Sequence, residues 1–231
     1  MDLHVHTTYS DGSSEPRAVV EKAIGLGIRS LGITDHYGGL ERYSIVSPAR
    51  LDEYITELKR LKQFYQAKID VWVGLETAIL DGLPFSQLNK LDYILFEDIE
   101  MNPRLGYFVS QVKPNLRIPV GMAHPQILLL EKSIDILEKE GIFIELNTHY
   151  SDRYKGNWAR TVWNKLASKD ICISVASDAH DIRRVGDTGD AVRFIKENGL
   201  SEKVWLDKKR QPEHSPRHVR KHSSPDPEAR F

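Results

Sequence analysis

Histidine and carboxylate side chains follow short apolar runs at many points between residues 2 and 180. His4 and His6 lie in the first run, and Asp178 and His180 follow the last one with the same alternating spacing. Between them, Asp35, His36, Glu76 and His124 each follow a further apolar run. Imidazole nitrogens and carboxylate oxygens are ligands for zinc, manganese and iron. If the ends of these runs meet in space, the pattern predicts a metal-dependent hydrolase.

The apolar runs alternate with longer amphipathic segments. Strands are predicted at residues 2–6, 29–34, 70–75, 92–96, 118–122, 142–146 and 172–176. Helices are predicted at 15–26, 51–65, 127–140, 158–169 and 187–198, with Gly141 and Gly199 as helix stops. Such alternation is typical of βα units around a parallel sheet.

The polar residues follow at least five different strands, which favours a barrel over an open sheet. An open doubly wound sheet usually gathers its site at one crevice, whereas a barrel collects side chains from many strands at its carboxyl rim. We therefore predict an α/β fold, a distorted seven-stranded TIM-like (βα)7 barrel, over residues 1–206. A chain of 231 residues is long enough for one such core.

The composition is that of an ordinary globular protein, with 40% hydrophobic and 28% charged residues. A formal net charge of -1 gives no whole-chain argument for a nucleic-acid or membrane partner. No apolar run approaches the ~20 residues of a membrane span, and no secretory signal is evident. Cys172 is the single cysteine, so no intrachain disulfide can form. These features predict a cytosolic protein, and they leave its oligomeric state open.

Residues 207–231 differ from the rest because they are rich in Lys, Arg, His, Ser and Pro and nearly lack aliphatic side chains. Such a segment buries too little apolar surface to offset its ordering entropy, which predicts a disordered basic tail. His218 and His222 have helical spacing for a metal site, but the prolines and charges around them favour a plain tail.

Each motif taken alone has an ordinary structural interpretation. His4 and His6 point the same way along a strand and could grip one ion, or they could be two polar residues at a strand edge. Asp11 could simply initiate the turn at Gly12. Tyr9 and Tyr37 could stack on a substrate ring or only pack. It is the number of ligand types at strand ends that favours a metal site.

The order of these motifs resembles the polymerase-and-histidinol-phosphatase (PHP) family. The motifs are HxH at 4–6, TxxSDG at 7–12, TDH at 34–36, GxE at 74–76, AHP at 123–125 and SDAH at 177–180. The similarity spans residues 2–190. It implies a distorted seven-stranded βα barrel that holds two or three divalent ions, zinc, manganese or iron, and hydrolyses phosphoesters.

The resemblance also implies a distribution of ligands. One ion is expected at His4, His6, Glu76 and Asp178. A second is expected at Glu76 and His124, and a third at Asp11, His36 and His180. Asp35 is expected to orient a ligand rather than to bind metal.

The chain departs from the family pattern after its fourth strand, where a further histidine usually serves the second ion. Residues 92–100 contain no histidine. Glu97 has the strand parity of the missing ligand and is the predicted substitute, with Asp98 and Glu100 as rivals. An oxygen ligand there would favour a harder ion such as manganese. Alternatively, the second position is weak or empty.

The predicted reaction is phosphoester hydrolysis by a metal-activated water, with Glu76, Asp178 and His180 as the catalytic residues. His180 or Asp178 could assist proton transfer, unless both are fully occupied as ligands. Arginines and polar side chains beyond the sixth and seventh strands could contact phosphate, or they could be solvated rim residues. These substrate candidates are Asn147, His149, Arg153, Arg183 and Arg184.

Three functions compete at this stage. The favoured one is a phosphatase acting on a small phosphomonoester such as histidinol phosphate or a nucleotide. The second is an exonuclease or phosphodiesterase acting on oligonucleotide ends, which would need a basic groove. The third is a catalytically weak barrel that binds metal or a partner protein, suggested by the missing histidine.

Overall fold

A computed structural model of the chain describes residues 1–101 and 103–205. The helices are α1 (Pro16–Gly25), α2 (Pro48–Tyr65), α3 (Phe85–Leu88), α4 (Arg104–Tyr107), α5 (Ile134–Glu140), α6 (Arg160–Ala167) and α7 (Gly189–Glu197). The strands are β1 (Ser30–Ile33), β2 (Asp70–Val73), β3 (Glu76–Thr77), β4 (Ile94–Phe96), β5 (Val120–Met122), β6 (Phe143–Asn147) and β7 (Ile173–Ala176). The segment 207–231, predicted to be a tail, lies outside the described residues.

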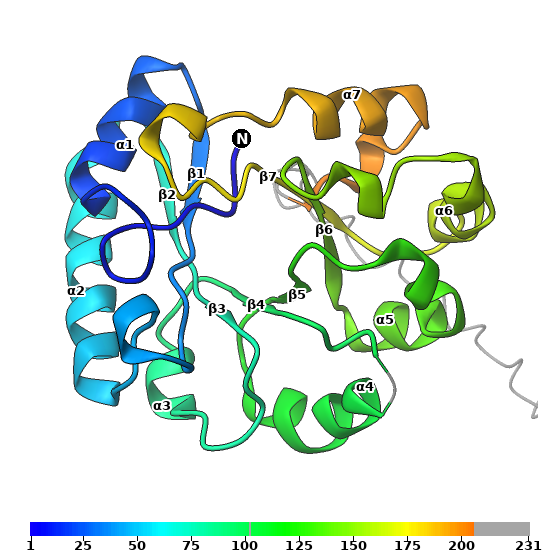
Figure 1. The fold of residues 1–231 in the computed structure, drawn as a ribbon, viewed down its shortest axis with the longest axis horizontal. Helices are drawn as coiled ribbons and strands as arrows, with labels where there is room; N and C mark the ends of the chain where they lie inside the picture. Colours follow the sequence, from blue (N-terminus) through cyan, green and yellow to red (C-terminus); the bar gives the residue numbers. More distant parts are fainter. Residues whose placement is uncertain (102, 206–231) are drawn as a thin grey trace, which may run out of the picture.

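All strand pairs are parallel, which confirms an α/β fold. The strands form two sheets, one of order β1-β2 and one of order β3-β4-β5-β6-β7. They lie in the middle of the molecule, with α1 and α2 on one side, α5 and α6 on the other and α7 above (Figure 1). Because the sheets are separate, the expected closed seven-stranded barrel is not confirmed.

The predicted strand 70–75 ends early in the structure, as β2 at residues 70–73, and a separate short strand, β3, follows it. β2 pairs with β1, and β3 pairs with β4, with Gly74 and Leu75 between them. Gly74 is required there because a Cβ would lie 2.6 Å from Thr34 and 2.7 Å from the Tyr93 ring. The Tyr93 ring lies beside Gly74, and its hydroxyl donates to the Leu3 carbonyl at 2.6 Å.

The predicted strand at 2–6 is wrong as a regular strand, although the segment lies between β1 and the end of β7. It makes isolated parallel bridges, Asp2 with Leu31 and Val5 with Ala179. On the β1 side, Gly32 N–H donates to Asp2 O, whereas Thr34 N–H donates to Val5 O. Between these two bonds the N-terminal segment advances by three residues, from Asp2 to Val5, whereas the segment at β1 advances by two. The N-terminal segment therefore has one extra residue, and this bulge interrupts the ladder.

Asp2 fastens this segment to the region after β7. Its buried carboxylate accepts from Ser177 N–H at 2.9 Å, from the Ser177 hydroxyl at 2.6 Å and from Gly186 N–H at 2.8 Å. Burial raises the pKa of Asp2, against the opposing effect of these three hydrogen bonds. The N-terminal segment is therefore held both by its backbone hydrogen bonds and by the side chain of Asp2.

Helix positions follow from local sequence signals. α2 begins after Ser47, whose hydroxyl accepts from Arg50 N–H at 3.2 Å, and Pro48 occupies its first turn. α5 ends at Gly141 with φ 64°, and Gly199 follows α7 with φ 66°, so both predicted helix stops are confirmed. The predicted helix 127–140 is instead a 3-10 segment, Ile127–Lys132, followed by α5.

Two apolar clusters form the core. The larger lies between the strands and the helices and includes the buried stripe of α2 at Leu51, Tyr54, Ile55, Leu58 and Leu61. The smaller contains Leu3, Tyr93, Leu95, Ala123, Phe143 and Trp205. The second cluster packs against the N-terminal segment, so it supports the backbone that carries His4 and His6.

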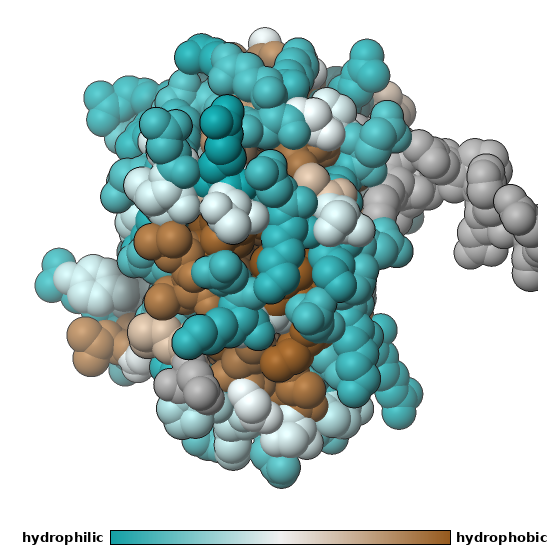
Figure 2. Space-filling model, turned by 90° about the vertical axis from the view of Figure 1, so that its right-hand side faces the viewer, coloured by the Kyte–Doolittle hydropathy of each residue, from teal (hydrophilic) through white to brown (hydrophobic). Residues whose placement is uncertain are grey.

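Apolar side chains also reach the surface near α5 and α6. Figure 2 shows brown areas among hydrophilic side chains on the face at the right of Figure 1. Leu128, Leu129, Ile136 and Trp158 are 40–50% exposed in this part of the chain. Scattered exposed apolar residues are ordinary on protein surfaces, so they identify no site. None of the helices within the described residues is long and apolar enough to span a lipid bilayer.

Candidate active site

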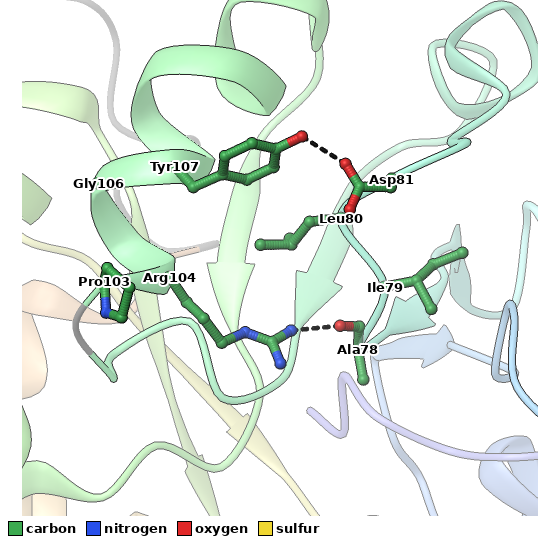
Figure 3. Close-up of a pocket in the computed structure, with 8 residues that line it drawn as sticks. All are labelled: Ala78, Ile79, Leu80, Asp81, Pro103, Arg104, Gly106 and Tyr107. Carbon is green, nitrogen blue, oxygen red and sulfur yellow. Dashed lines mark hydrogen bonds between the residues drawn. The ribbon is translucent and has the colours of Figure 1, made fainter.

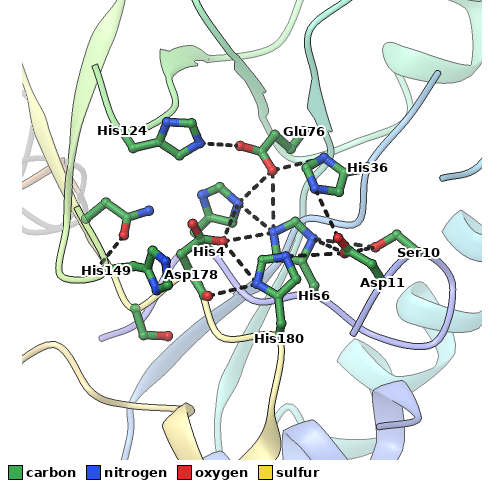
Figure 4. Close-up of polar contacts among 12 residues, drawn as sticks. His4, His6, Ser10, Asp11, His36, Glu76, His124, His149, Asp178 and His180 are labelled. Carbon is green, nitrogen blue, oxygen red and sulfur yellow. Dashed lines mark hydrogen bonds and ion pairs between the residues drawn. The ribbon is translucent and has the colours of Figure 1, made fainter. Parts of the chain in front are cut away.

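Four of the predicted ligands form a buried inner group: His4, His6, Glu76 and Asp178 (Figure 4). Nε2 of His4 lies 3.0 Å from Nε2 of His6 and 3.0 Å from Oε2 of Glu76. Nε2 of His6 lies 3.1 Å from Oδ1 of Asp178. The bulged N-terminal segment thus still directs both imidazoles towards one point, as their i, i+2 spacing predicts.

Glu145 was not predicted and is the main addition to the site. This β6 carboxylate is 1% exposed and lies 2.8 Å from Nδ1 of His4. Its other oxygen accepts from His124 N–H at 3.2 Å and from the Asn147 amide at 2.7 Å. Glu145 therefore fixes the ring of His4 from behind, so that Nε2 faces the inner group. A single acid within the apolar run of β6 was the available sequence signal.

Asp11, His36 and His180 form a second, more exposed outer group. Nε2 of His180 lies 3.3 Å from Oδ1 of Asp11, and Nε2 of His36 lies 3.8 Å from Oδ2 of Asp11. The side chains of Asp11, His36 and His180 are 28%, 25% and 40% exposed. With His6, they place one ligand atom each within 4.8 Å of one another.

Asp35 precedes His36 in sequence, and its side chain bonds to the loop that carries Asp11. Its carboxylate accepts from Thr7 N–H at 2.8 Å, from the Thr7 hydroxyl at 2.7 Å and from the Ser10 hydroxyl at 2.6 Å. These bonds hold the loop that carries Asp11. Asp35 is therefore placed to orient a ligand through its loop, in the manner expected from the sequence.

Glu76 connects these groups with His124 and Glu97. Its Oε1 lies 3.1 Å from Nε2 of His124, and its Oε2 lies 3.2 Å from Nδ1 of His36. Glu97 lies 3.6 Å from that same nitrogen of His36, and the three residues form a further candidate cation group. Glu97 thus lies beside His36 and Glu76, and its role as the substitute for the missing histidine remains a prediction.

The rivals of Glu97 lie elsewhere. Asp98 is exposed and has φ 55°. Glu100 is buried and accepts from Gln126 N–H at 3.1 Å. Neither belongs to the candidate cation groups found among the described residues.

Two of the site residues have unusual backbone conformations. His124 has φ 31° and Asp178 has φ 54°, in the left-handed region that non-glycine residues seldom adopt. Such conformations persist only where the surrounding structure enforces them, and they concentrate at functional sites.

The groups influence one another's ionisation. Burial opposes ionisation of Glu76 and Asp178, but the imidazoles of His4 and His6 outweigh it and lower the pKa of both carboxyls. Burial also opposes protonation of His180, yet Asp11 and Asp178 raise its pKa to about 9. Neighbouring carboxylates also raise the pKa of His4 against its burial, so His4 and His180 balance part of the carboxylate charge.

The phosphate candidates are divided between two positions. Arg153 is half-buried and donates to the His124 carbonyl at 2.7 Å, with Nδ1 of His124 at 3.0 Å. Arg184 lies 3.3 Å from Nδ1 of the exposed His149.

The other two candidates make local contacts. Asn147 is 1% exposed, and its amide is used by Glu145 and by His149 N–H. Arg183 is 86% exposed and pairs with Asp181. Its contacts are those of the solvated rim residue considered as the alternative.

The donor set suits divalent cations. Two imidazole nitrogens face one another at 3.0 Å beside carboxylate oxygens, an arrangement that a shared cation would satisfy. Among the described residues, the groups that could hold divalent ions are His4, His6 and Asp178, then His36, Glu76 and Glu97, and then His6, Asp11, His36 and His180. The expected ion at Glu76, His124 and Glu97 remains a prediction.

Comparisons with known proteins agree with the motif order. The sequence model of the PHP domain matches residues 2–100. A probable phosphatase of Acetivibrio thermocellus is 27% identical over 213 residues, covering 85% of this chain and 86% of the relative. The DNA polymerase/3'-5' exonuclease PolX of Bacillus subtilis is 27% identical over 138 residues, but the match spans 22% of its length.

The fold is shared with a solved structure of histidinol phosphate phosphatase from Lactococcus lactis, complexed with zinc, L-histidinol and phosphate. The TM-score is 0.60 at 18% identity, covering 86% of this chain and 93% of the other. Over residues 2–100 the chain is therefore similar to the PHP domain, in agreement with the motif order, and over most of its length it shares the fold of that phosphatase.

Proposed function

We propose that this protein is a metal-dependent phosphatase that hydrolyses a small phosphomonoester. The observation that carries the proposal is the convergence of the inner group, the outer group, His124 and Glu97 around one buried carboxylate, Glu76. When bound, two or three divalent ions would acidify a water molecule and offset charge on the phosphoryl oxygens. The cytosolic location expected from the sequence remains a prediction.

Glu76, Asp178 and His180 are the proposed catalytic residues. Glu76 contacts both groups, so its two oxygens can orient His124 on one side and His36 on the other. Asp178 contacts His6 and faces His180, whose Nδ1 lies 3.6 Å from Oδ1 of Asp178. His180 is the most exposed of these groups, which suits a residue that passes a proton to the departing oxygen when its Nε2 is not bound to a cation.

Arg153 is the proposed phosphate-binding arginine nearest the site. A guanidinium only donates, so Nδ1 of His124 accepts from Arg153 and the ring proton lies on Nε2. For Nε2 to bind a cation, that proton must move to Nδ1, which could then no longer accept a hydrogen bond from Arg153. Arg153 would then keep its bond to the His124 carbonyl and have donors available for phosphate. Arg184 and His149 would contact the substrate at a greater distance from the cation-binding groups.

A small substrate is favoured over an oligonucleotide. The whole-length relative is named a phosphatase, whereas the match to the exonuclease PolX covers a small part of that protein. With a formal net charge of -1, the chain has no overall excess of cationic side chains to displace counterions from the phosphates of an oligonucleotide.

The test is a screen of metal-stripped protein reloaded with manganese, zinc or iron. Substrates would include histidinol phosphate, nucleoside monophosphates and short oligonucleotides. We expect metal-dependent release of inorganic phosphate from a monoester and its loss in Glu76→Ala. Turnover that is the same in Glu76→Ala would eliminate the proposed metal chemistry. Cleavage of oligonucleotides alone would favour the exonuclease.

A further inference from the structure

A cavity of about 920 Å³ lies between the loop after β3 and helix α4. One wall is formed by residues 78–81, and the other by Pro103, Arg104, Gly106 and Tyr107 (Figure 3). Pockets for small organic ligands commonly have volumes of roughly 300–1,000 Å³. The cavity is therefore large enough for the organic part of a small metabolite.

The lining is mainly apolar with a few polar groups. Leu80 lies on one wall and the ring of Tyr107 on the other, and Ile79 lies further along the loop (Figure 3). The two walls are joined by hydrogen bonds, from the Tyr107 hydroxyl to Asp81 and from the Arg104 guanidinium to the Ala78 carbonyl. An apolar ring would fit such a lining.

One wall of the cavity directly follows, in sequence, the segment that carries Glu76. Ala78 follows Glu76 by two residues, and the Thr77 hydroxyl donates to the Tyr37 carbonyl at 2.8 Å, beside His36. Ile79 also packs on Gly38, where an added Cβ would lie 2.8 Å from Ile79 Cδ1. The segments that carry His36 and Glu76 thus lead directly into one wall.

We propose that this cavity receives the leaving group of the substrate, and that the leaving group is an alcohol or phenol with an apolar ring. This inference rests on the proposed phosphatase function. In the reaction, water oxygen forms the new bond to phosphorus and the ester P–O bond breaks. The departing oxygen takes a proton, so the products are inorganic phosphate and the free alcohol, which leaves through the cavity.

Gly106→Trp tests the cavity directly. A Cβ at Gly106 meets nothing within 4 Å, and its φ is not positive, so a side chain can be added without backbone strain. Gly25→Trp is the matched control, because Gly25 lies at the end of α1 and is equally open. The substrates are 2-naphthyl phosphate and methyl phosphate, which differ in the size of the leaving group.

We expect Gly106→Trp to lower kcat/KM for 2-naphthyl phosphate by about 10- to 100-fold. Its kcat/KM for methyl phosphate should change by less than about twofold, and Gly25→Trp should leave both values unchanged, since neither residue contacts the ligand groups. Unchanged naphthyl phosphate turnover in Gly106→Trp, or an equal loss for both esters, would overturn the assignment.

Binding of 2-naphthol, followed by ligand-observed NMR, tests the cavity apart from catalysis. Binding by the unmodified protein and by Gly25→Trp, but not by Gly106→Trp, supports the assignment. Equal binding by all three proteins, or by none, overturns it. Failure of the unmodified protein to hydrolyse either ester with any metal would count against the proposed function, while naphthol binding would still decide the cavity.

Discussion

The inner and outer groups contain the same residue types but are built differently. The inner residues are 0–6% exposed and lie at the N-terminal segment and at strand ends, with Glu145 holding His4 from behind. The outer residues are 25–40% exposed, and Asp11 depends on a loop held by Asp35. The inner group is therefore the preorganised part, and the outer group is the part that ligand binding or pH can alter.

The largest effect is expected where the two groups meet. Glu76→Gln keeps the shape of the side chain but removes the charge that His4, His36 and His124 share. We expect kcat to fall by roughly 10³-fold or more, because residues that act as a unit lose most of their effect together. Steady-state kinetics at saturating metal would measure this. Glu131→Gln, at an exposed acid, is the control and should keep full activity.

Glu145→Gln should weaken the inner group without touching the outer one. One of the oxygens facing His4 Nδ1 and His124 N–H is replaced by an amide donor, so one contact is lost. Loss of a partner behind a metal-binding histidine typically weakens metal affinity about 10- to 100-fold. Titration calorimetry with manganese or zinc would measure the change, and excess metal should restore activity. Unaltered affinity would show that Glu145 is only a packing residue.

Asp11→Asn should affect the outer group alone. Loss of a direct ligand should lower the metal affinity at least as much as loss of a residue that only hydrogen-bonds to a ligand, by about 10-fold or more. Metal content per chain after dialysis should fall by up to one ion, while the inner group keeps its metal. If Asp11→Asn lost every ion, the division into two groups would be wrong.

Metal binding at the outer group should also depend on pH. The pKa of His180 is raised to about 9 by Asp11 and Asp178, so below that pH a cation must displace a proton. Affinity should therefore rise from about pH 7 towards pH 9, by at most about tenfold per pH unit for one proton. Calorimetry in buffers of different ionisation enthalpy would count the protons released. His180→Asn should flatten the profile.

Much of the fold could be predicted because its strands are short apolar runs between helical segments. Six predicted strand regions contain strands, and the helix stops at Gly141 and Gly199 are confirmed. The first strand and the closed barrel could not be judged from local sequence. The bulge between Asp2 and Val5 is a matter of register, which depends on residues far along the chain.

In the site, too, local motifs could be predicted, but contacts between residues far apart in sequence could not. Its motifs could be found because each ends an apolar run, and the structure brings their histidines and acids together. The roles of individual ligands remain predictions. Glu145 was missed because its partner, His4, is 141 residues away in sequence. The cavity beside α4 was missed because its walls come from the loop after β3 and from the short helix α4, neither of which has a regular sequence pattern.

The junction between the N-terminal segment and the end of β7 has a consequence for folding. Leu3 N–H donates to Val175 O, Asp178 N–H donates to His4 O, and Ser177 binds Asp2. Residues 2–5 can pair early with β1, but their bonds to residues 175–178 form only after a long intervening stretch of chain has been made. Closing so long a loop is slow, and this side of residues 2–5 stays exposed until it closes. Cations that bridge His6 and Asp178 would join the two ends, so metal supply should speed maturation of newly made chains.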